Sequence, residues 1–264
     1  MTIQDQWFDG AILRLADPQN QRVWSIIVSL FGDLAQGPDD RISGAALTRI
    51  IQPMHVKPEA IRVALHRLRK DGWVDSARSG RSSVHHLTEF GRAQSAAVTP
   101  RIYDRDPDIP HDWHLLMSEG SGSLDDLLLT ENYISIGRNA ALGSGAIPPN
   151  CDDMVVFNVT ARNVPSWLKS RLCPPDLIKA CGSLADAVKD VPSSRPAELN
   201  LTAAQVATLR TLIVHRWRRV ALRNPDLPPM FFPDDWRGQD CRASVFALLD
   251  TLPKPDLNAL NAPV

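Results

Sequence analysis

The chain has 264 residues, 44% of them hydrophobic, and a formal net charge of −1 at pH 7. This is the composition of a globular protein with room for two or three domains. The polar N-terminus and the lack of any apolar run near the roughly 20 residues that cross a bilayer argue against a secretion signal or a membrane span, so we expect a cytoplasmic protein. Four widely spaced cysteines without a C-x-x-C pair argue against a zinc site or a disulfide scaffold.

Two apolar helices are predicted in the first fifty residues. Hydrophobic side chains recur at helical spacing from Val23 to Leu34. After the polar loop 36–40, a second helix begins with Ser43 as its N-cap and stops at Pro53.

A basic helix is predicted next, starting at Pro58, because proline suits the first helical position. Its apolar residues form one stripe at helical spacing: Ile61, Ala64, Leu65 and Leu68. The opposite, solvent-facing side is mostly cationic and includes Arg62, His66, Arg67, Arg69 and Lys70. Gly72 follows where a helix end needs a left-handed residue.

A β-hairpin is predicted after this helix, with the two-residue turn Ser79-Gly80 between its strands. Arg78 and Arg81 flank the turn, and no carboxylate lies between Arg78 and His86. The tip of the hairpin is therefore cationic, which suits a phosphate or a narrow minor groove.

The order of helix, helix, basic helix and hairpin is that of a winged helix-turn-helix. From Arg41 to Arg92 the chain has ten Lys and Arg against four Asp and Glu, so positive charge is concentrated in one part of a nearly neutral protein. Because phosphate neutralisation supplies most nonspecific DNA affinity, this segment is predicted to bind DNA. The alternative is a winged helix used for protein contacts, with its arginines as ordinary surface charges.

Eight residues are predicted to contact DNA: Ser43, Lys57, Arg62, His66, Arg67, Arg69, Arg78 and Arg81. Arg62, His66 and Arg69 are assigned to the major groove, because arginine bonds guanine bidentately and histidine offers one donor or acceptor. The two hairpin arginines are assigned to the wing, and the residues at helix starts to phosphates.

A small α+β unit is predicted in the middle of the chain. A helix capped by Thr88 runs toward Tyr103, and the charged, proline-broken segment 104–110 is the predicted linker. Beyond it, short apolar strands are expected at 113–117, 133–136 and 154–159, with a helix starting at Ser123 and a glycine-rich crossover over 137–145. This order is compatible with a ferredoxin-like βαββ arrangement.

The chain beyond Pro165 is predicted to be almost wholly helical, with helices at 166–172, 175–191, 202–222 and 243–252. The helix capped by Thr202 ends in a second basic cluster: His215, Arg216, Trp217, Arg218, Arg219 and Arg223. One interpretation is a solvated face whose cations favour the negative end of the helix dipole. The other is a patch that binds a phosphorylated effector or serves dimerisation, and the sequence does not separate them.

No enzyme motif is present, so we predict no catalytic residue, metal or cofactor. The glycine pairs at 120/122 and 143/145 lack the third glycine and the lysine of a nucleotide-binding loop. The enzymatic alternative is a DNA-targeted, metal-dependent nuclease, which would require Asp112, Asp152 and Asp153 to converge.

Motifs in both halves of the chain resemble the PaaX family of repressors. They are Ser29–Asp33, Ala60–Leu68 with Asp71-Gly72-Trp73, Gly80-Arg81, Leu87-Thr88 and Gly91-Arg92, then His215–Arg219, Asp226–Pro229, and Pro233, Asp235 and Trp236. The resemblance implies a multi-domain α+β protein with a winged helix-turn-helix (1–105), a small ferredoxin-like, Cas2-like α+β domain (106–163) and a helical C-terminal domain (164–264).

The same resemblance implies a homodimer that represses a catabolic operon, such as one for phenylacetate, by binding double-stranded operator DNA. Release would come from an aryl-acetyl-CoA such as phenylacetyl-CoA, or from another acyl-CoA. The alternative nuclease would then be Cas2-like. Tyr103 and Tyr133 are the only tyrosines, so a pocket built partly from tyrosine is depleted and the effector stays open.

Overall fold

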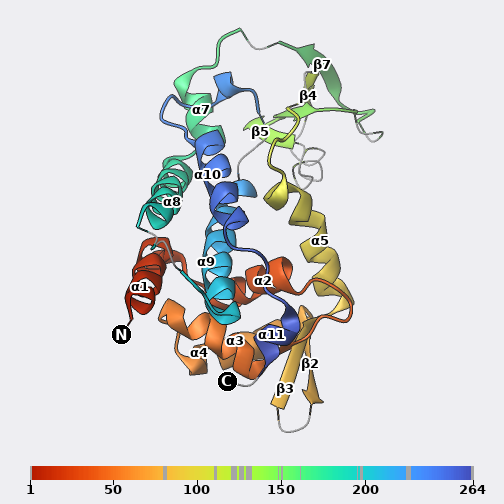
Figure 1. Cartoon of the computed structure of the whole chain (residues 1–264). Helices are drawn as coiled ribbons and strands as arrows, with labels where there is room; N and C mark the ends of the chain where they lie inside the picture. Colours follow the sequence, from red (N-terminus) through yellow and green to blue (C-terminus); the bar gives the residue numbers. More distant parts are fainter. Residues whose placement is uncertain are drawn as a thin grey trace. The chain divides into compact units, whose positions relative to one another are not determined.

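The structure, a computed structural model, describes residues 2–262 except 80–81, 110–111, 120–123, 125–127, 129–132, 148, 150, 161, 195, 197–198 and 224–226 (Figure 1). Internal contacts divide the chain into two compact units. Unit 1 comprises Met1–Arg105, Ala180–Leu222 and Arg237–Val264, and unit 2 comprises Asp106–Lys179 and Arg223–Trp236. Both helices and antiparallel sheets are present, so the predicted α+β class is confirmed. The division into three domains stays a prediction.

Unit 1 is mainly helical. Its helices are α1 (Ile3–Leu15), α2 (Val23–Leu34), α3 (Gly44–Ile51), α4 (Pro58–Lys70), α5 (Glu89–Tyr103), α9 (Ala203–Ala221), α10 (Gly238–Asp250) and α11 (Leu257–Asn261), with most of α8 (Pro175–Ser193). Sequence reasoning missed α1, which starts with a capping box between Thr2 and Asp5. It also placed the start of α10 too late, at residue 243.

A three-stranded sheet accompanies the N-terminal helices. It consists of β1 (Ile42–Ser43), β2 (Val74–Ser79) and β3 (Ser82–Leu87), in the order β1-β3-β2 with antiparallel pairing. The hairpin strands and the N-cap are confirmed, since the hydroxyl of Ser43 accepts a hydrogen bond from the Ala46 amide. The short strand β1 adds a third member to the predicted hairpin.

Helix α4 forms as its sequence predicts. Pro58 occupies the first turn, and the apolar stripe is buried: Ile61, Ala64, Leu65 and Leu68. Gly72 follows with φ 73°, a left-handed conformation that disfavours residues with a Cβ. The stripe packs on α2, so the cationic side of α4 is left to solvent.

Helix α9 is the central element of unit 1. It contacts α1, α2, α3, α5, α10 and α11, which surround it (Figure 1). Every residue from Ala207 to Trp217 is consequently buried, including three charged or titratable side chains. A helix buried on all sides must place its polar groups against internal partners.

Unit 2 is a four-stranded sheet with short helices. Its strands are β4 (Trp113–Met117), β5 (Tyr133–Gly137), β6 (Ala140–Ser144) and β7 (Val155–Val159), in the order β5-β6-β4-β7 with antiparallel neighbours. Helix α7 (Ser166–Leu172) and the 3-10 turn Pro229–Phe231 complete it. The helix predicted from Ser123 lies outside the described residues, except for Leu124 and Leu128.

The prediction of a crossover over 137–145 is wrong, because residues 140–144 form strand β6. Glycine is uncommon in strands, so Gly143 made strand β6 hard to predict from the sequence. At Gly143 a Cβ would lie 2.3 Å from a ring carbon of Tyr133, so only glycine admits that ring. The Tyr133 hydroxyl in turn lies 2.6 Å from Nε2 of buried His114.

The sheet of unit 2 has an apolar core on each face. One face contributes Leu116, Tyr133 and Ala141, and the other contributes Leu142, which packs with Leu172, Leu227 and Phe231. Among the described helices of either unit, none is long and apolar enough to cross a membrane.

Candidate nucleic-acid interface

The exposed side of α4 is mostly cationic. Its solvent-facing residues are Glu59, Arg62, Val63, His66, Arg67, Arg69 and Lys70. Arg62, His66 and Arg69 lie four and three residues apart, so they share one stripe of the helix. The structure therefore brings together the residues assigned to the major groove.

Two of these arginines have exposed partners. The Arg62 guanidinium pairs with Glu59 at 2.8 Å, and both side chains are about 70% exposed (72% and 69%). Such a pair contributes at most about 1 kcal/mol, so it opens readily for a competing anion. Arg67 lies 3.4 Å from the Asp71 carboxylate and 5.3 Å from the ring centroid of Trp24, which directs it along the helix flank.

Three other side chains of this surface have no hydrogen bond or ion pair in the part of the chain that the structure describes: Arg69, Lys70 and His66. Val63, 70% exposed between them, was not among the predicted contacts. An exposed apolar residue on such a face suits the methyl group of thymine. The sequence could have indicated Val63, because helical spacing places it on the outward side of α4.

The hairpin next to α4 is held by a buried histidine. The His85 ring lies between the hydroxyls of Ser76 (2.7 Å) and Ser83 (3.3 Å). Burial, followed by the nearby Arg69 charge, lowers the pKa of His85, so it is neutral at pH 7. The strands are thereby fixed, and Arg78 projects to solvent.

The other predicted DNA contacts are placed differently. Lys57 is exposed at the start of α4. Ser43 is 8% exposed and its hydroxyl caps α3, which makes it the least accessible of the set. Arg81 lies outside the described residues. The DNA contacts of all eight residues stay predictions.

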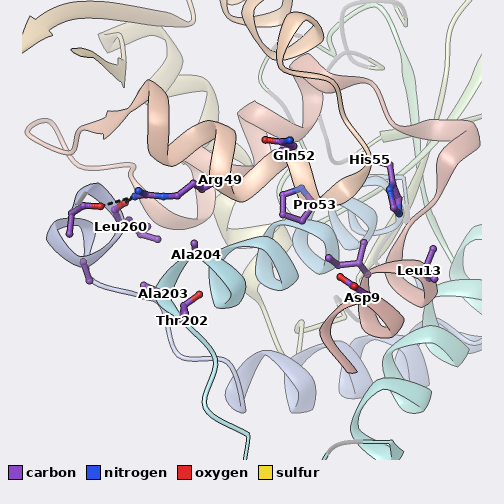
Figure 2. Close-up of a pocket in the computed structure, with 13 residues that line it drawn as sticks. Asp9, Leu13, Arg49, Gln52, Pro53, His55, Thr202, Ala203, Ala204 and Leu260 are labelled. Atoms are coloured by element: carbon purple, nitrogen blue, oxygen red, sulfur yellow. Dashed lines mark hydrogen bonds between the residues drawn. The ribbon is translucent and has the colours of Figure 1, made fainter. Parts of the chain in front are cut away.

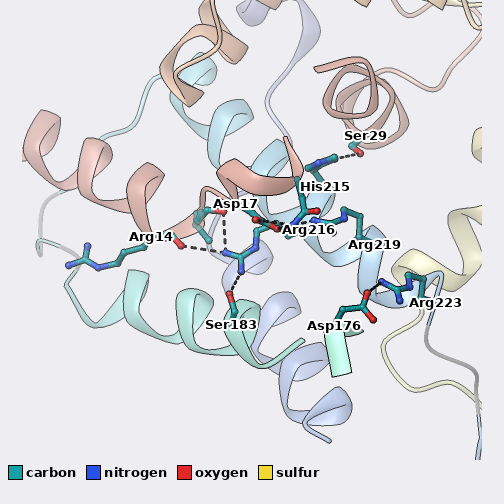
Figure 3. A network of polar contacts seen from close by, with 11 residues as sticks. Arg14, Asp17, Ser29, Asp176, Ser183, His215, Arg216, Arg219 and Arg223 are labelled. Carbon is teal, nitrogen blue, oxygen red and sulfur yellow. Dashed lines mark hydrogen bonds and ion pairs between the residues drawn. The ribbon is translucent and has the colours of Figure 1, made fainter. Parts of the chain in front are cut away.

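The second basic cluster lies mostly inside unit 1 (Figure 3). The Arg216 guanidinium donates to the Leu15 carbonyl at 3.2 Å and to Ser183 Oγ at 2.7 Å. Trp217 Nε1 donates to the Ile102 carbonyl at 2.7 Å. These side chains are internal links between helices in this structure.

The other arginines of the cluster are less buried. Arg219 pairs with Asp17 at 2.9 Å and Arg223, in unit 2, with Asp176 at 2.8 Å. Arg218 is half-buried, and burial lowers the pKa of its guanidinium. The effector or dimer role assigned to the cluster stays a prediction. Arg218 is the member whose side chain has no described hydrogen bond.

His215, within this cluster, predicts a pH dependence of stability. Burial lowers its pKa from 6.5 to about 4, and Nδ1 lies 3.3 Å from Ser29 Oγ. The neutral ring therefore contributes stability that is complete above pH 6.5 and is lost as the pH falls toward 4. The loss reaches about 3 kcal/mol.

Urea unfolding between pH 7.5 and about 4.5 measures this effect. The variant His215→Gln is expected to show a flatter pH dependence than the wild type, because glutamine does not titrate. Equal slopes for the two proteins would contradict the assignment to His215.

Unit 1 also has a cavity of about 860 Å³ away from the α4 surface, lined by parts of α1, α3, α9 and α11 (Figure 2). Its single lining arginine, Arg49, donates to the carbonyls of Leu260 and Ala262. The guanidinium thus anchors the C-terminal segment. No cluster of three metal-ligating residues occurs among the residues that the structure describes.

A helix with an exposed, mostly cationic side next to a two-stranded hairpin is typical of nucleic-acid-binding proteins. The chain belongs to the PaaX-like family. The family model "PaaX-like protein" matches residues 22–91 and "PaaX-like protein C-terminal domain" matches residues 176–255, together more than half of the chain. The family predicted from the motifs is confirmed.

One relative and one solved structure are similar to this chain. The transcriptional repressor PaaX of Escherichia coli (strain K12) is 26% identical, over 83% of this chain and 76% of the relative. The solved structure of the uncharacterized protein Rv0674 from Mycobacterium tuberculosis is 17% identical with a TM-score of 0.50, covering 86% of this chain and 94% of that one. The first confirms a non-enzymatic regulator family, and the second shows the fold alone.

Proposed function

We propose that this protein is a repressor that binds operator DNA through a winged helix-turn-helix. Helix α4 is the recognition helix in the major groove and the β2–β3 hairpin is the wing. The observation that carries the proposal is the exposed stripe of Arg62, His66 and Arg69, of which the last two have no described polar partner. Basic side chains without internal partners are available for phosphates and base edges.

The architecture proposed with it follows the described elements. The β1-β3-β2 sheet behind α3 and α4 supports the winged form, and the antiparallel order β5-β6-β4-β7 supports a ferredoxin-like central unit. A cytoplasmic location accords with a DNA-binding role.

The finer proposal concerns regulation. We infer a homodimer that binds two operator half-sites about one helical turn apart, near a catabolic operon. An acyl-CoA thioester relieves repression by binding more tightly to the dimer geometry that does not match the half-sites. Support comes from family membership and from the repressor activity of the Escherichia coli relative.

An electrophoretic mobility shift with the promoter region beside this protein's own gene tests the function. Arg69→Ala is expected to weaken specific binding by about 1–3 kcal/mol, or 5- to 150-fold, if the guanidinium contacts a base. Arg62→Ala should reduce discrimination between operator and random DNA in the same way.

The matched control is Arg14→Ala, which removes an exposed arginine from α1 in the same unit. It should leave the affinity unchanged. If the wild-type protein binds no DNA at low salt, or if all three variants behave alike, the recognition-helix assignment fails.

A further inference from the structure

Unit 2 contains a cavity of about 540 Å³ on one face of its sheet. Its floor is formed by Trp113, Leu115, Leu142 and Val159, which come from β4, β6 and β7. Its walls are Leu168 of α7 and the segment Pro228–Phe231. Three parts of the sequence thus border one concave space.

The chemistry of the lining is apolar. No described residue that lines the cavity is charged, and Thr160 supplies the single side-chain hydroxyl among them. Pro228 and Pro229 have no amide hydrogen to offer. An ion placed inside would lose its hydration without gaining a partner, so the cavity favours an uncharged group.

Internal contacts hold the walls in place. Phe231 is 6% exposed and belongs to the core cluster with Leu142 and Leu172, and its ring centroid lies 6.2 Å from that of Trp113. Leu168 packs against the same cluster, and α7 contacts the turn Pro229–Phe231. The space is therefore preformed.

We propose that this cavity binds the aryl or alkyl group of an amphipathic small molecule, whose charged part stays at the mouth in solvent. The volume agrees: an apolar cavity of about 150 Å³ already binds benzene, and ligand pockets run from about 300 to 1,000 Å³. This inference rests on the proposed function and deepens it, because it assigns the apolar part of the effector to unit 2. It gives no role to the buried residues of α9.

A small molecule is favoured over a protein partner because the site is concave, with a wall on either side of its floor. The same sheet face does continue into side chains that are about half exposed, Met117, Val155 and Phe157 at 44%, 55% and 47%. These lie outside the cavity lining. Burial of that flatter strip by a second copy would alter oligomeric mass rather than ligand affinity.

The test uses the full chain and the fluorescent probe 1-anilinonaphthalene-8-sulfonate. The probe should bind the folded wild type and be displaced by octanoyl-CoA or phenylacetyl-CoA but not by free CoA. Leu168→Trp, which fills the cavity, should weaken probe binding about tenfold or more. Ser170→Trp adds the same ring to an exposed position of α7 and should have no effect.

Met230→Trp fills the cavity from the other wall and, at 40% exposure of Met230, leaves the core intact. It keeps the test valid if Leu168→Trp does not fold, as judged by thermal unfolding. Equal probe affinities for the filled variants and Ser170→Trp would overturn the proposal, as would a change in mass by Leu168→Trp with unchanged probe affinity. Operator binding measured without ligand separates the two claims. Filled variants that still bind operator DNA but have lost probe binding support both the function and the pocket. A wild type that binds the probe but no operator DNA contradicts the proposed function and not the pocket.

Discussion

Replacing Asp33 with alanine is expected to lower the free energy of unfolding by about 3–5 kcal/mol, because it leaves the buried Arg210 guanidinium without its counter-charge. The Asp33 side chain is fully buried and that of Arg210 is 6% exposed. Arg210 Nε and Nη2 each donate to one carboxylate oxygen at 2.9 Å, a bidentate geometry. The Tyr103 hydroxyl donates to the same carboxylate at 2.7 Å.

Two further variants distinguish the loss of this buried ion pair from the general effect of a mutation on the free energy of unfolding. Asp17→Ala removes the partner of Arg219, a partly exposed pair at the same distance (31% and 26% exposed), and should cost about 1 kcal/mol or less. The double variant Asp33→Leu with Arg210→Met replaces both charges by apolar groups and should recover most of the loss. Chemical denaturation measures all of them, and a loss under about 1 kcal/mol for Asp33→Ala would contradict the argument.

The position of this ion pair explains why the two ends of the sequence form one unit. Asp33 is on α2, on which α4 packs, and Arg210 is on α9. The hydroxyl of Tyr103, at the end of α5, completes the link by donating to Asp33, and burial raises the pKa of this hydroxyl. Helix α2, on which α4 packs, is therefore linked to residues far along the chain, namely Tyr103 and Arg210.

The sequence predicted α4 well because its two sides differ in chemistry. Apolar residues at helical spacing face α2, and cations face solvent, so periodicity alone identifies both the helix and its candidate surface. For α9 the same reasoning could not predict which side chains are buried. Arginine and histidine are usually exposed, and only tertiary contacts with six other helices make His215 and Arg216 interior residues.

The cavity of unit 2 was beyond sequence reasoning for a related reason. Its lining comes from positions as far apart as Ile109 and Phe231, and one of its floor strands, β6, was hidden by Gly143. Short apolar strands show which residues are buried but not which of them leave a space between elements. Enclosed volume depends on how α7 and Pro228–Phe231 approach the sheet.

Trp217→Ala is expected to lower the free energy of unfolding by about 3–5 kcal/mol. Trp217 is 1% exposed, its ring meets Phe246 edge-on with centroids 6.3 Å apart, and the Arg242 guanidinium lies 5.2 Å from its centroid. Truncation opens a cavity at the crossing of α9 and α10. It also removes the donor to the Ile102 carbonyl.

Trp217→Phe separates these two losses, because it keeps most of the ring while deleting the indole donor, and it should cost about 1–3 kcal/mol. Trp167→Ala, at a tryptophan that is 59% exposed, should stay within about 0.5 kcal/mol of the wild type. Thermal and urea unfolding measure the series. If Trp217 instead served an exposed effector or dimer surface, Trp217→Ala would leave stability near that of Trp167→Ala and change ligand affinity or mass.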